Sequence, residues 1–225
     1  MWLWWSSGKD SAWALQLLRQ DPEVSVERLI TTVTPTVGRV AIHGTRVSVL
    51  EAQASAVGVP VQSIELPYPC TNPEYEAAVQ PVLQEAAATE LDSMAFGDLF
   101  LEDVREYRER LLSGTGVDSL FPLWGLDTVG LSRQMVESGV EAYVTCLDPT
   151  RVGREHAGAR FDHVFLDNLP ESVDPCGERG EFHTCATAGP MFEPDIAVSV
   201  GDIVEREGFV YADLLLDQWA PHGAR

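Results

Sequence analysis

The sequence predicts an α/β fold, with a doubly wound parallel sheet in the N-terminal half and a smaller C-terminal α/β domain. Two observations carry this prediction. Apolar runs alternate with helical patterns through the first half, as in stacked β-α units. A length of 225 residues allows one large domain or two small ones. Because the pattern becomes loop-like after the last of these units, we place the domain boundary near residue 118, with domains at 1–118 and 119–225.

The elements of the first half follow from apolar runs and turn residues. The ranges expected as strands are 2–5, 26–34, 61–66 and 93–100, and those expected as helices are 11–19, 45–57, 72 onward and 102–112. Gly58 ends the second helix. Asn72-Pro73 begins the third, because a capping side chain precedes a proline at the first helical position. Pro81 is expected to kink or divide that helix, since an interior proline removes a backbone hydrogen bond.

The second half contains fewer clear elements. A helix is expected over 127–138, ended by Gly139, and a strand over 142–147. Residues 149–193 are rich in Gly, Pro, His and charged residues, which is typical of loops. Two antiparallel strands, 196–200 and 204–216, are predicted to turn at Glu207-Gly208.

Composition limits the classes of partner. The formal charge of −20 repels nucleic acid and anionic membrane surfaces. No apolar run approaches the roughly 20 residues that span a bilayer, and the N-terminal run is too short for a signal peptide. The four cysteines form no Cys-x-x-Cys pair, so neither a zinc ribbon nor a redox dithiol is indicated. We expect a cytoplasmic protein without nucleic-acid or membrane partners; its oligomeric state, a homodimer included, stays open.

Residues 6–11, Ser-Ser-Gly-Lys-Asp-Ser, contain the only lysine of the chain. We call them the phosphate loop. A strand, a small-residue turn and a helix N-terminus aim backbone N–H groups and a helix dipole at one point, where phosphate is the expected occupant. The spacing is not that of Gly-x-x-x-x-Gly-Lys, and a serine-rich helix cap is the alternative interpretation. The Lys9 side chain is expected to face solvent when no nucleotide is bound.

Residues 96–105 follow the fourth predicted strand, at the carboxyl end where open α/β sheets bind ligands. Asp98, Glu102 and Asp103 lie there, and carboxylate oxygens are ligands that Mg²⁺ prefers. Acidic residues at a first helical turn are also ordinary caps. The two interpretations are equally supported by this segment alone.

Residues 174–184, which we call the acidic motif, place Glu178 and Glu181 beside two glycines. The backbone can therefore fold closely with both carboxylates toward one pocket, although an exposed acidic turn is the alternative. Cys176 lies in the same motif, but only His183 is near enough in sequence to activate its thiol. A weaker segment, 41–46, contains His43 and Arg46, which could contact a phosphate or carboxylate. A capping histidine and a surface arginine are equally well supported.

These segments together resemble the diphthine–ammonia ligase family of ATP-binding proteins, in its shorter form. The matching segments are the phosphate loop, Ile42-His43-Gly44, Phe96-Gly97-Asp98-Leu99-Phe100-Leu101-Glu102-Asp103, Phe121-Pro122-Leu123-Trp124-Gly125 and Gly177-Glu178-x-Gly180-Glu181-Phe182-His183-Thr184. The resemblance implies a PP-loop domain of the adenine nucleotide alpha hydrolase-like (HUP) type, with substrate held between it and the second domain. Ser7 stands where the family has glycine, so a positive φ there would carry a steric cost.

The family resemblance also implies a reaction. A substrate carboxylate attacks the α-phosphate of ATP in the presence of Mg²⁺, pyrophosphate leaves, and ammonia displaces AMP to form an amide. The implied partners are ammonium and a carboxylate-bearing substrate: diphthine on elongation factor 2 where the source makes it, otherwise a small molecule or another protein. Two alternatives stay open, namely a non-catalytic ATP or AMP sensor and a PP-loop enzyme of tRNA modification. Net charge and cysteine spacing disfavour the latter.

Residue roles carry over on the matched motifs. The implied catalytic residues are Lys9, Asp10, Glu178 and Glu181. The implied ATP-binding residues are Ser6, Ser7, Gly8, Lys9, Asp10, Ser11, Thr32, Val33, His43, Gly97 and Asp98. The implied substrate-binding residues are Glu102, Asp103, Arg105, Gly177, Glu178, Gly180, Glu181 and His183. The implied Mg²⁺ ligands are Asp98 and Asp103.

Overall fold

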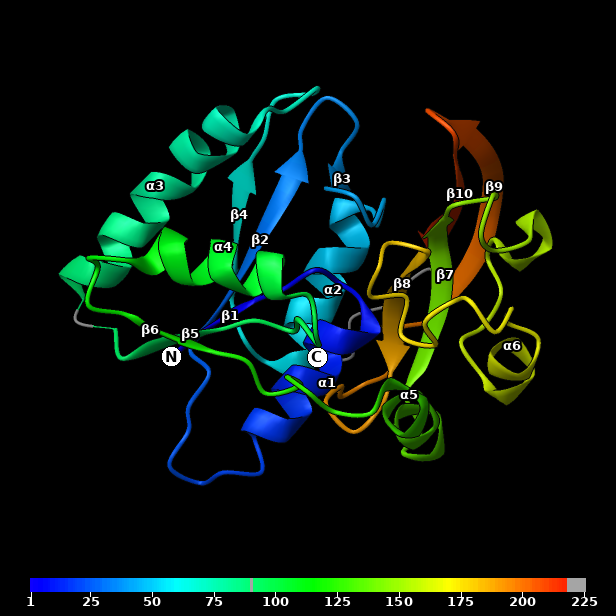
Figure 1. Cartoon of the computed structure of the whole chain (residues 1–225), viewed down its shortest axis with the longest axis horizontal. Helices are drawn as coiled ribbons and strands as arrows, with labels where there is room; N and C mark the ends of the chain where they lie inside the picture. Colours follow the sequence, from blue (N-terminus) through cyan, green and yellow to red (C-terminus); the bar gives the residue numbers. More distant parts are fainter. Residues whose placement is uncertain (90, 218–225) are drawn as a thin grey trace, which may run out of the picture.

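The computed structural model describes residues 1–89 and 91–217, which form two domains on two β-sheets (Figure 1). The first sheet contains parallel strands in the order β4, β2, β1, β5, β6. These strands are β1 (Trp2–Trp4), β2 (Arg28–Thr34), β4 (Val61–Glu65), β5 (Ser93–Ala95) and β6 (Asp118–Leu120). The short strand β3 (Arg39–Val40) pairs antiparallel with the end of β2. The predicted doubly wound α/β architecture is therefore confirmed.

Helices cover both faces of this sheet (Figure 1). They are α1 (Lys9–Leu18), α2 (Val47–Val57), α3 (Asn72–Ala88) and α4 (Glu102–Leu112). Successive strand side chains point to opposite faces. Leu3 therefore packs in the core that contains residues of α1 and α2, whereas Trp2 and Trp4 pack with α3 and α4.

The second sheet is antiparallel, in the order β8, β7, β10, β9. Its strands are β7 (Glu141–Leu147), β8 (Phe182–Ala188), β9 (Val198–Arg206) and β10 (Phe209–Leu216). Helices α5 (Thr128–Glu137) and α6 (His163–Asp167) pack beside it, and a 3-10 turn lies at Arg154–His156. One apolar core runs from α1 and α2 into this domain, through Phe161 and Phe182.

Local signals predicted several boundaries well. Gly58 ends α2 in the left-handed conformation, with φ 68°. Asn72-Pro73 begins α3 as expected, and Thr71 and Glu74 form a capping box there. The β9–β10 hairpin turns at Glu207-Gly208, which both have positive φ.

Two expectations about elements were wrong, and a third was wrong in part. Pro81 was expected to kink or divide α3, and division does not occur, because α3 continues through Pro81 to Ala88. The strand expected over 93–100 ends at Ala95, because the following residues leave the sheet and form the edge of a cavity. Strand β8 was not predicted, since its segment had been assigned to a loop-like region.

Among the described residues, no helix is long and apolar enough to cross a membrane.

The strand order reverses between β1 and β5. The chain passes from β1 to β2 and β4 on one side, and then returns to β5 and β6 on the other. Ligands of open α/β sheets bind outside the carboxyl ends of the strands at such a switch point. The phosphate loop follows β1, and residues 96–101 follow β5, so both segments lie at this position.

Candidate functional site

A cavity of about 300 Å³ lies at the switch point, between the two domains. We call it the central cavity. The first domain contributes Trp4, Ser6, Lys9, Asp10, Ser11, Ile42, His43, Phe96, Gly97, Asp98, Leu101, Val104 and Arg108. The second domain contributes Cys176, Gly177, Glu178, Phe182, His183 and Thr184. The structure thus brings together three segments that are far apart in sequence: the phosphate loop, residues 96–98 and the acidic motif.

The phosphate loop is ordered by its own serines. The Ser6 hydroxyl lies 3.2 Å from the Ser11 hydroxyl and accepts a hydrogen bond from the Gly8 N–H at 3.3 Å. The Ser11 hydroxyl donates to the Gly8 carbonyl at 3.0 Å. The N–H of Lys9, at the start of α1, donates to the Thr184 hydroxyl of β8 at 3.2 Å. The loop is therefore held from within and from the second domain.

Ser7 has a φ of 70°, in the region that favours glycine. Its side-chain oxygen is buried without a hydrogen-bond partner among the described residues. Its carbonyl accepts hydrogen bonds from Gln53 Nε2 and from the Ala186 N–H, both at 2.9 Å. These two contacts hold the peptide in the strained orientation, so the geometry of a glycine-containing loop is kept without the glycine.

Glycine fits where the loops approach each other. A Cβ at Gly8 would lie 2.9 Å from Cε1 of His43 and would displace that ring. A Cβ at Gly97 would lie 3.1 Å from the backbone nitrogen of Ser11, so the backbone would have to shift by a few tenths of an ångström. The absence of a Cβ therefore allows the loop after β5 to pack directly on the first turn of α1.

Lys9 does not face solvent, which corrects the expectation from sequence. Its side chain is 2% exposed, and its ammonium group donates to the Cys176 carbonyl at 2.5 Å and to Asp10 Oδ2 at 2.9 Å. The ammonium nitrogen lies over the rings of Phe161 and Phe182, 5.1 and 5.4 Å from their centroids. Burial on its own lowers the pKa of Lys9, but the charge and hydrogen bond of Asp10, together with Cys176 and Asp174, outweigh burial and raise the pKa. Lys9 is consequently a buried, permanently charged group.

Two histidines from the two domains meet beside the phosphate loop. The rings of His43 and His183 are 4.7 Å apart, and His43 Nδ1 lies 3.1 Å from the Thr184 carbonyl oxygen. Burial lowers the pKa of His43 to about 4, and burial together with His43 and Lys9 lowers the pKa of His183 well below its usual value. Both imidazoles are therefore neutral at neutral pH. Since a carbonyl only accepts, His43 carries its proton on Nδ1.

Arg108 of α4 is a cavity residue that the sequence interpretation missed. Its Nε lies 3.4 Å from Asp98 Oδ2, and its guanidinium group lies over the rings of Trp4 and Phe96 at 5.4 and 5.1 Å. The lining thus combines aromatic surface with a cation and a carboxylate. Such a combination suits a ligand that has both an apolar ring and charged groups.

Glu178 joins the acidic motif to the loop after β5. Its Oε1 accepts hydrogen bonds from the N–H groups of Leu99 at 2.8 Å and Phe100 at 3.4 Å. Burial raises the pKa of Glu178 to about 7; the Leu99 N–H opposes this shift, and the charges of Asp10 and Asp98 add to it. The carboxyl group can therefore gain or lose a proton near neutral pH.

The carboxylates of the cavity suit a hard cation only in part. Asp10 Oδ1 and Asp98 Oδ2 are buried and form no hydrogen bond within the described part of the chain. No group of three or more His, Cys, Asp or Glu residues is arranged to hold a metal ion among those residues. Mg²⁺ commonly binds through one or two carboxylates and the phosphates of a substrate. Asp10 Oδ1 therefore suits Mg²⁺ that arrives with a nucleotide, whereas Asp98 Oδ2 already lies 3.4 Å from Arg108 Nε.

Several residues that the sequence implicated lie away from the cavity lining. Glu181 is fully buried, where it pairs with Arg151 at 2.9 Å and accepts the Asp174 N–H at 3.1 Å. The remaining members of this set are Ser7, Gly8, Thr32, Val33, Glu102, Asp103, Arg105 and Gly180. Their roles stay predictions that the geometry does not support directly. Glu102 and Asp103 are exposed on the first turn of α4, as caps would be.

Arg105 and Cys176 have clear structural environments. The Arg105 guanidinium lies over Phe121 and Trp124 at 5.1 and 4.8 Å, and Arg105 pairs with Glu109 at 2.8 Å. Cys176 is buried, and burial raises the pKa of its thiol far above the usual value. A nucleophilic thiolate at Cys176 is therefore disfavoured.

Comparisons with known proteins agree with this arrangement. Residues 2–119 match the family model described as the diphthamide synthase N-terminal domain, and residues 127–213 match the diphthamide synthase C-terminal domain. A diphthine–ammonia ligase of Schizosaccharomyces pombe is 27% identical over 120 residues. That match covers 52% of this chain and 20% of the Schizosaccharomyces pombe protein, so the matched part of the chain spans about a fifth of that relative's length. With both of its domains matched in order, the chain belongs to the diphthamide synthase family.

Proposed function

We propose that this protein is an ATP-dependent, AMP-forming diphthine–ammonia ligase. The observation that carries the proposal is the convergence of the phosphate loop and the acidic motif on the central cavity. A ligase of this kind must hold a nucleotide, a carboxylate and ammonia together, and a cavity between two domains can bind all three. The family match and the named activity of the Schizosaccharomyces pombe relative support the same assignment.

The first step we propose is adenylation. A substrate carboxylate oxygen attacks the α-phosphorus of ATP, and the bond to the pyrophosphate oxygen breaks. Lys9 uses two of its three donors on Cys176 and Asp10, which leaves one for a phosphate oxygen. Its fixed charge is suited to stabilising the negative charge that develops on the leaving group. Mg²⁺, held by Asp10 or Asp98, would supply further neutralisation of the phosphates.

The second step we propose is amide formation. Ammonia attacks the acyl carbon of the adenylate, the C–N bond forms, and AMP leaves with the electrons of the C–O bond. The nitrogen must lose a proton in this step. Glu178, with a pKa of about 7, lines the cavity and is suited to accept that proton.

A reconstituted reaction tests this function. Purified protein is incubated with Mg-ATP, ammonium and elongation factor 2 that carries diphthine, while AMP, pyrophosphate and the amide product are measured. The proposal predicts equal amounts of the three products, and no amide when ammonium is omitted. ATP binding without AMP formation under all of these conditions would favour the nucleotide sensor instead.

A further inference from the structure

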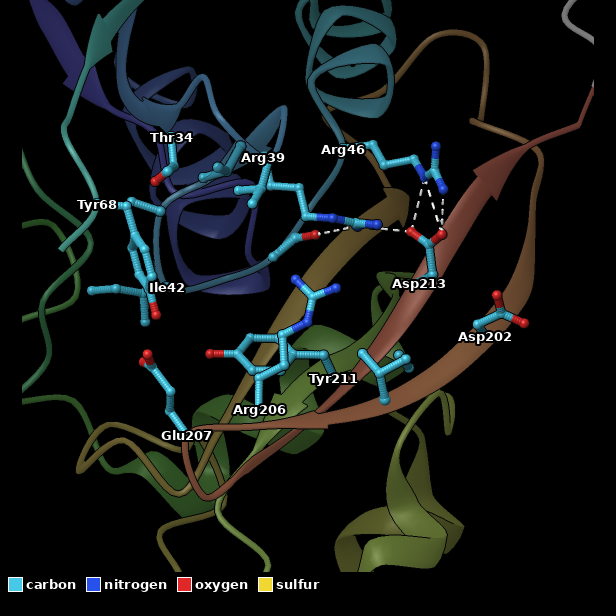
Figure 2. Close-up of a pocket in the computed structure, with 16 residues that line it drawn as sticks. Thr34, Arg39, Ile42, Arg46, Tyr68, Asp202, Arg206, Glu207, Tyr211 and Asp213 are labelled. Carbon is cyan, nitrogen blue, oxygen red and sulfur yellow. Dashed lines mark hydrogen bonds and ion pairs between the residues drawn. The ribbon is translucent and has the colours of Figure 1, made fainter.

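A second and larger pocket, of about 620 Å³, lies between the first domain and the β9–β10 hairpin (Figure 2). We call it the hairpin pocket. One wall is formed by the end of β2, by β3 with the loop that follows it, and by Tyr68; the other is formed by the hairpin. Figure 2 shows Tyr68, Arg206 and Tyr211 directed into the space between these walls. Its volume is about twice the 300 Å³ of the central cavity.

The two cavities share one residue. Ile42 lines both the hairpin pocket and the central cavity, and the next residue, His43, lines the central cavity beside the phosphate loop. The Ile42 side chain is 69% exposed although it is a large aliphatic group. The two cavities therefore adjoin at Ile42, and a ligand in the hairpin pocket would lie next to the central cavity.

The backbone at Ile42 is strained. Its φ is 67°, which is a true outlier for a β-branched residue. The strained conformation is kept because the loop is bonded on both sides: Ala41 N–H donates to the Thr32 carbonyl at 3.0 Å, and Gly44 N–H donates to the Val40 carbonyl at 3.1 Å. Strain held in this way is typical of ligand-binding sites. It fixes Ile42 at the border of the two cavities.

An ion cluster joins the two walls of the pocket. Asp213 of β10 accepts from Arg39 at 2.7 Å and from Arg46 Nε at 2.9 and 3.1 Å (Figure 2). Arg206 lines the same pocket and forms no ion pair among the residues that the structure describes. The lining holds three arginines and three carboxylates, Asp202, Glu207 and Asp213, so the pocket is formally neutral. In a chain of net charge −20, it repels an anionic group less than the average surface does.

The composition of the pocket indicates the kind of ligand. Tyr and Arg are the residue types enriched at protein-binding surfaces, because they combine contact area with hydrogen bonding. Tyr68 is 59% exposed and Val204 is 38% exposed, so apolar surface is also available. A single carboxylic acid group would leave most of this pocket empty. A folded or extended polypeptide segment would fill it.

We propose that the hairpin pocket binds the polypeptide segment that presents the substrate carboxylate, which then reaches the central cavity across Ile42. The inference rests on the proposed ligase function and assigns the place where the protein substrate docks. It accounts for three features that nucleotide binding leaves unexplained: the larger pocket, the strained Ile42, and Arg206, which has no ion-pair partner in the described part of the chain.

A steric block in the hairpin pocket tests the inference. Val204→Trp fills the pocket, whereas Ile203→Trp is the matched control, because Ile203 is the neighbouring β9 residue, is 55% exposed and does not line the pocket. The expected result for Val204→Trp is a rise of about tenfold or more in KM for diphthine-bearing elongation factor 2. The KM for ATP is expected to stay unchanged. Tyr68→Ala, at an exposed position where folding is little affected, should raise the same KM.

The outcomes separate this inference from the ligase function. Normal KM values for the protein substrate in both Val204→Trp and Tyr68→Ala would overturn the docking site while leaving the ligase intact. Equal use of a free small carboxylic acid, unaffected by either variant, would also overturn it. If the wild type binds ATP but forms no AMP, the ligase function fails and the docking site is tested by binding alone. The same protein substrate is then titrated into the ATP-bound chain, and its affinity is measured for the wild type and for the variants. Binding weakened by Val204→Trp alone supports the site, and absent or unchanged binding refutes it.

Discussion

The ammonium nitrogen of Lys9 lies 2.5 Å from the carbonyl oxygen of Cys176, so the only lysine of the chain joins the phosphate loop to the acidic motif. The contact links two segments that are 167 residues apart. It makes the phosphate loop and the second domain one structural unit. Lys9 is consequently important for stability as well as for the ATP use proposed above.

Lys9→Ala is expected to lower the free energy of unfolding by about 3 kcal/mol, because Asp10 then loses its buried partner. Urea denaturation measures this change. The double variant Lys9→Met with Asp10→Asn removes both charges at similar volume, so most of the stability should return while AMP formation stays lost. AMP formation by the double variant would contradict the catalytic role of the pair.

Glu178→Gln is expected to change how stability depends on pH. Burial raises the pKa of Glu178 from its ordinary 4.5 to about 7, so between these values the folded protein binds more protons than the unfolded chain. The stability of the wild type should therefore fall as pH rises through this window. The glutamine variant should lose this decline and keep ATP affinity, since its amide oxygen can still accept from Leu99. Unfolding midpoints of the wild type and the variant, measured at both ends of this pH window, test the effect. If stability changes with pH by the same slope in both proteins, the prediction is refuted.

Ser7→Gly is expected to stabilise the protein by about 1 kcal/mol, because it relieves a positive φ in a non-glycine residue. Ser7→Ala is the control: it removes the unpartnered hydroxyl but keeps the strained backbone. Urea midpoints of the two variants separate the contributions. A destabilised glycine variant would mean that the Ser7 hydroxyl has a partner in solution.

Asp213→Asn is expected to destabilise the contact between the domains at neutral pH, by about 2 kcal/mol, since Arg39 and Arg46 then lack their shared carboxylate. Burial raises the pKa of Asp213, but hydrogen bonds from Arg46 and Arg39 outweigh it and lower the pKa from 3.8 to about 2. The stabilisation should therefore disappear as pH falls through this range. Chemical denaturation of both proteins across these pH values measures the difference in their free energies of unfolding. A difference that stays constant with pH would refute this account.

Features set by local sequence were predicted correctly. The end of α2 at Gly58 and the turn at Glu207-Gly208 depend on residues that accept positive φ, which can be recognised without tertiary context. The strand, turn and helix around residues 6–11 were also predicted correctly, since small residues lie between an apolar run and a helical pattern; phosphate binding there stays a prediction. That the phosphate loop lies close to the acidic motif was indicated only by the family resemblance.

Features set by tertiary contacts were missed. Lys9 is buried because Phe161 and Phe182 of the second domain enclose it, and nothing near Lys9 in sequence indicates this. Strand β8 contains small and hydroxyl residues without clear alternation, so its segment resembled a loop. Arg108 lies in a charged helix, where it looks like any surface arginine. Glu181 matched a motif, but its neighbour Arg151 directs it into the protein interior.

The most direct test of the ligase function follows the oxygen atoms of the substrate. The carboxylate of the substrate is labelled with heavy oxygen, and the reaction is run with Mg-ATP and ammonium. Adenylation predicts that one labelled oxygen appears in AMP, because the acyl C–O bond breaks when ammonia attacks. Label in inorganic phosphate together with ADP formation, or no transfer of label while the amide forms, would contradict the proposed chemistry of the central cavity.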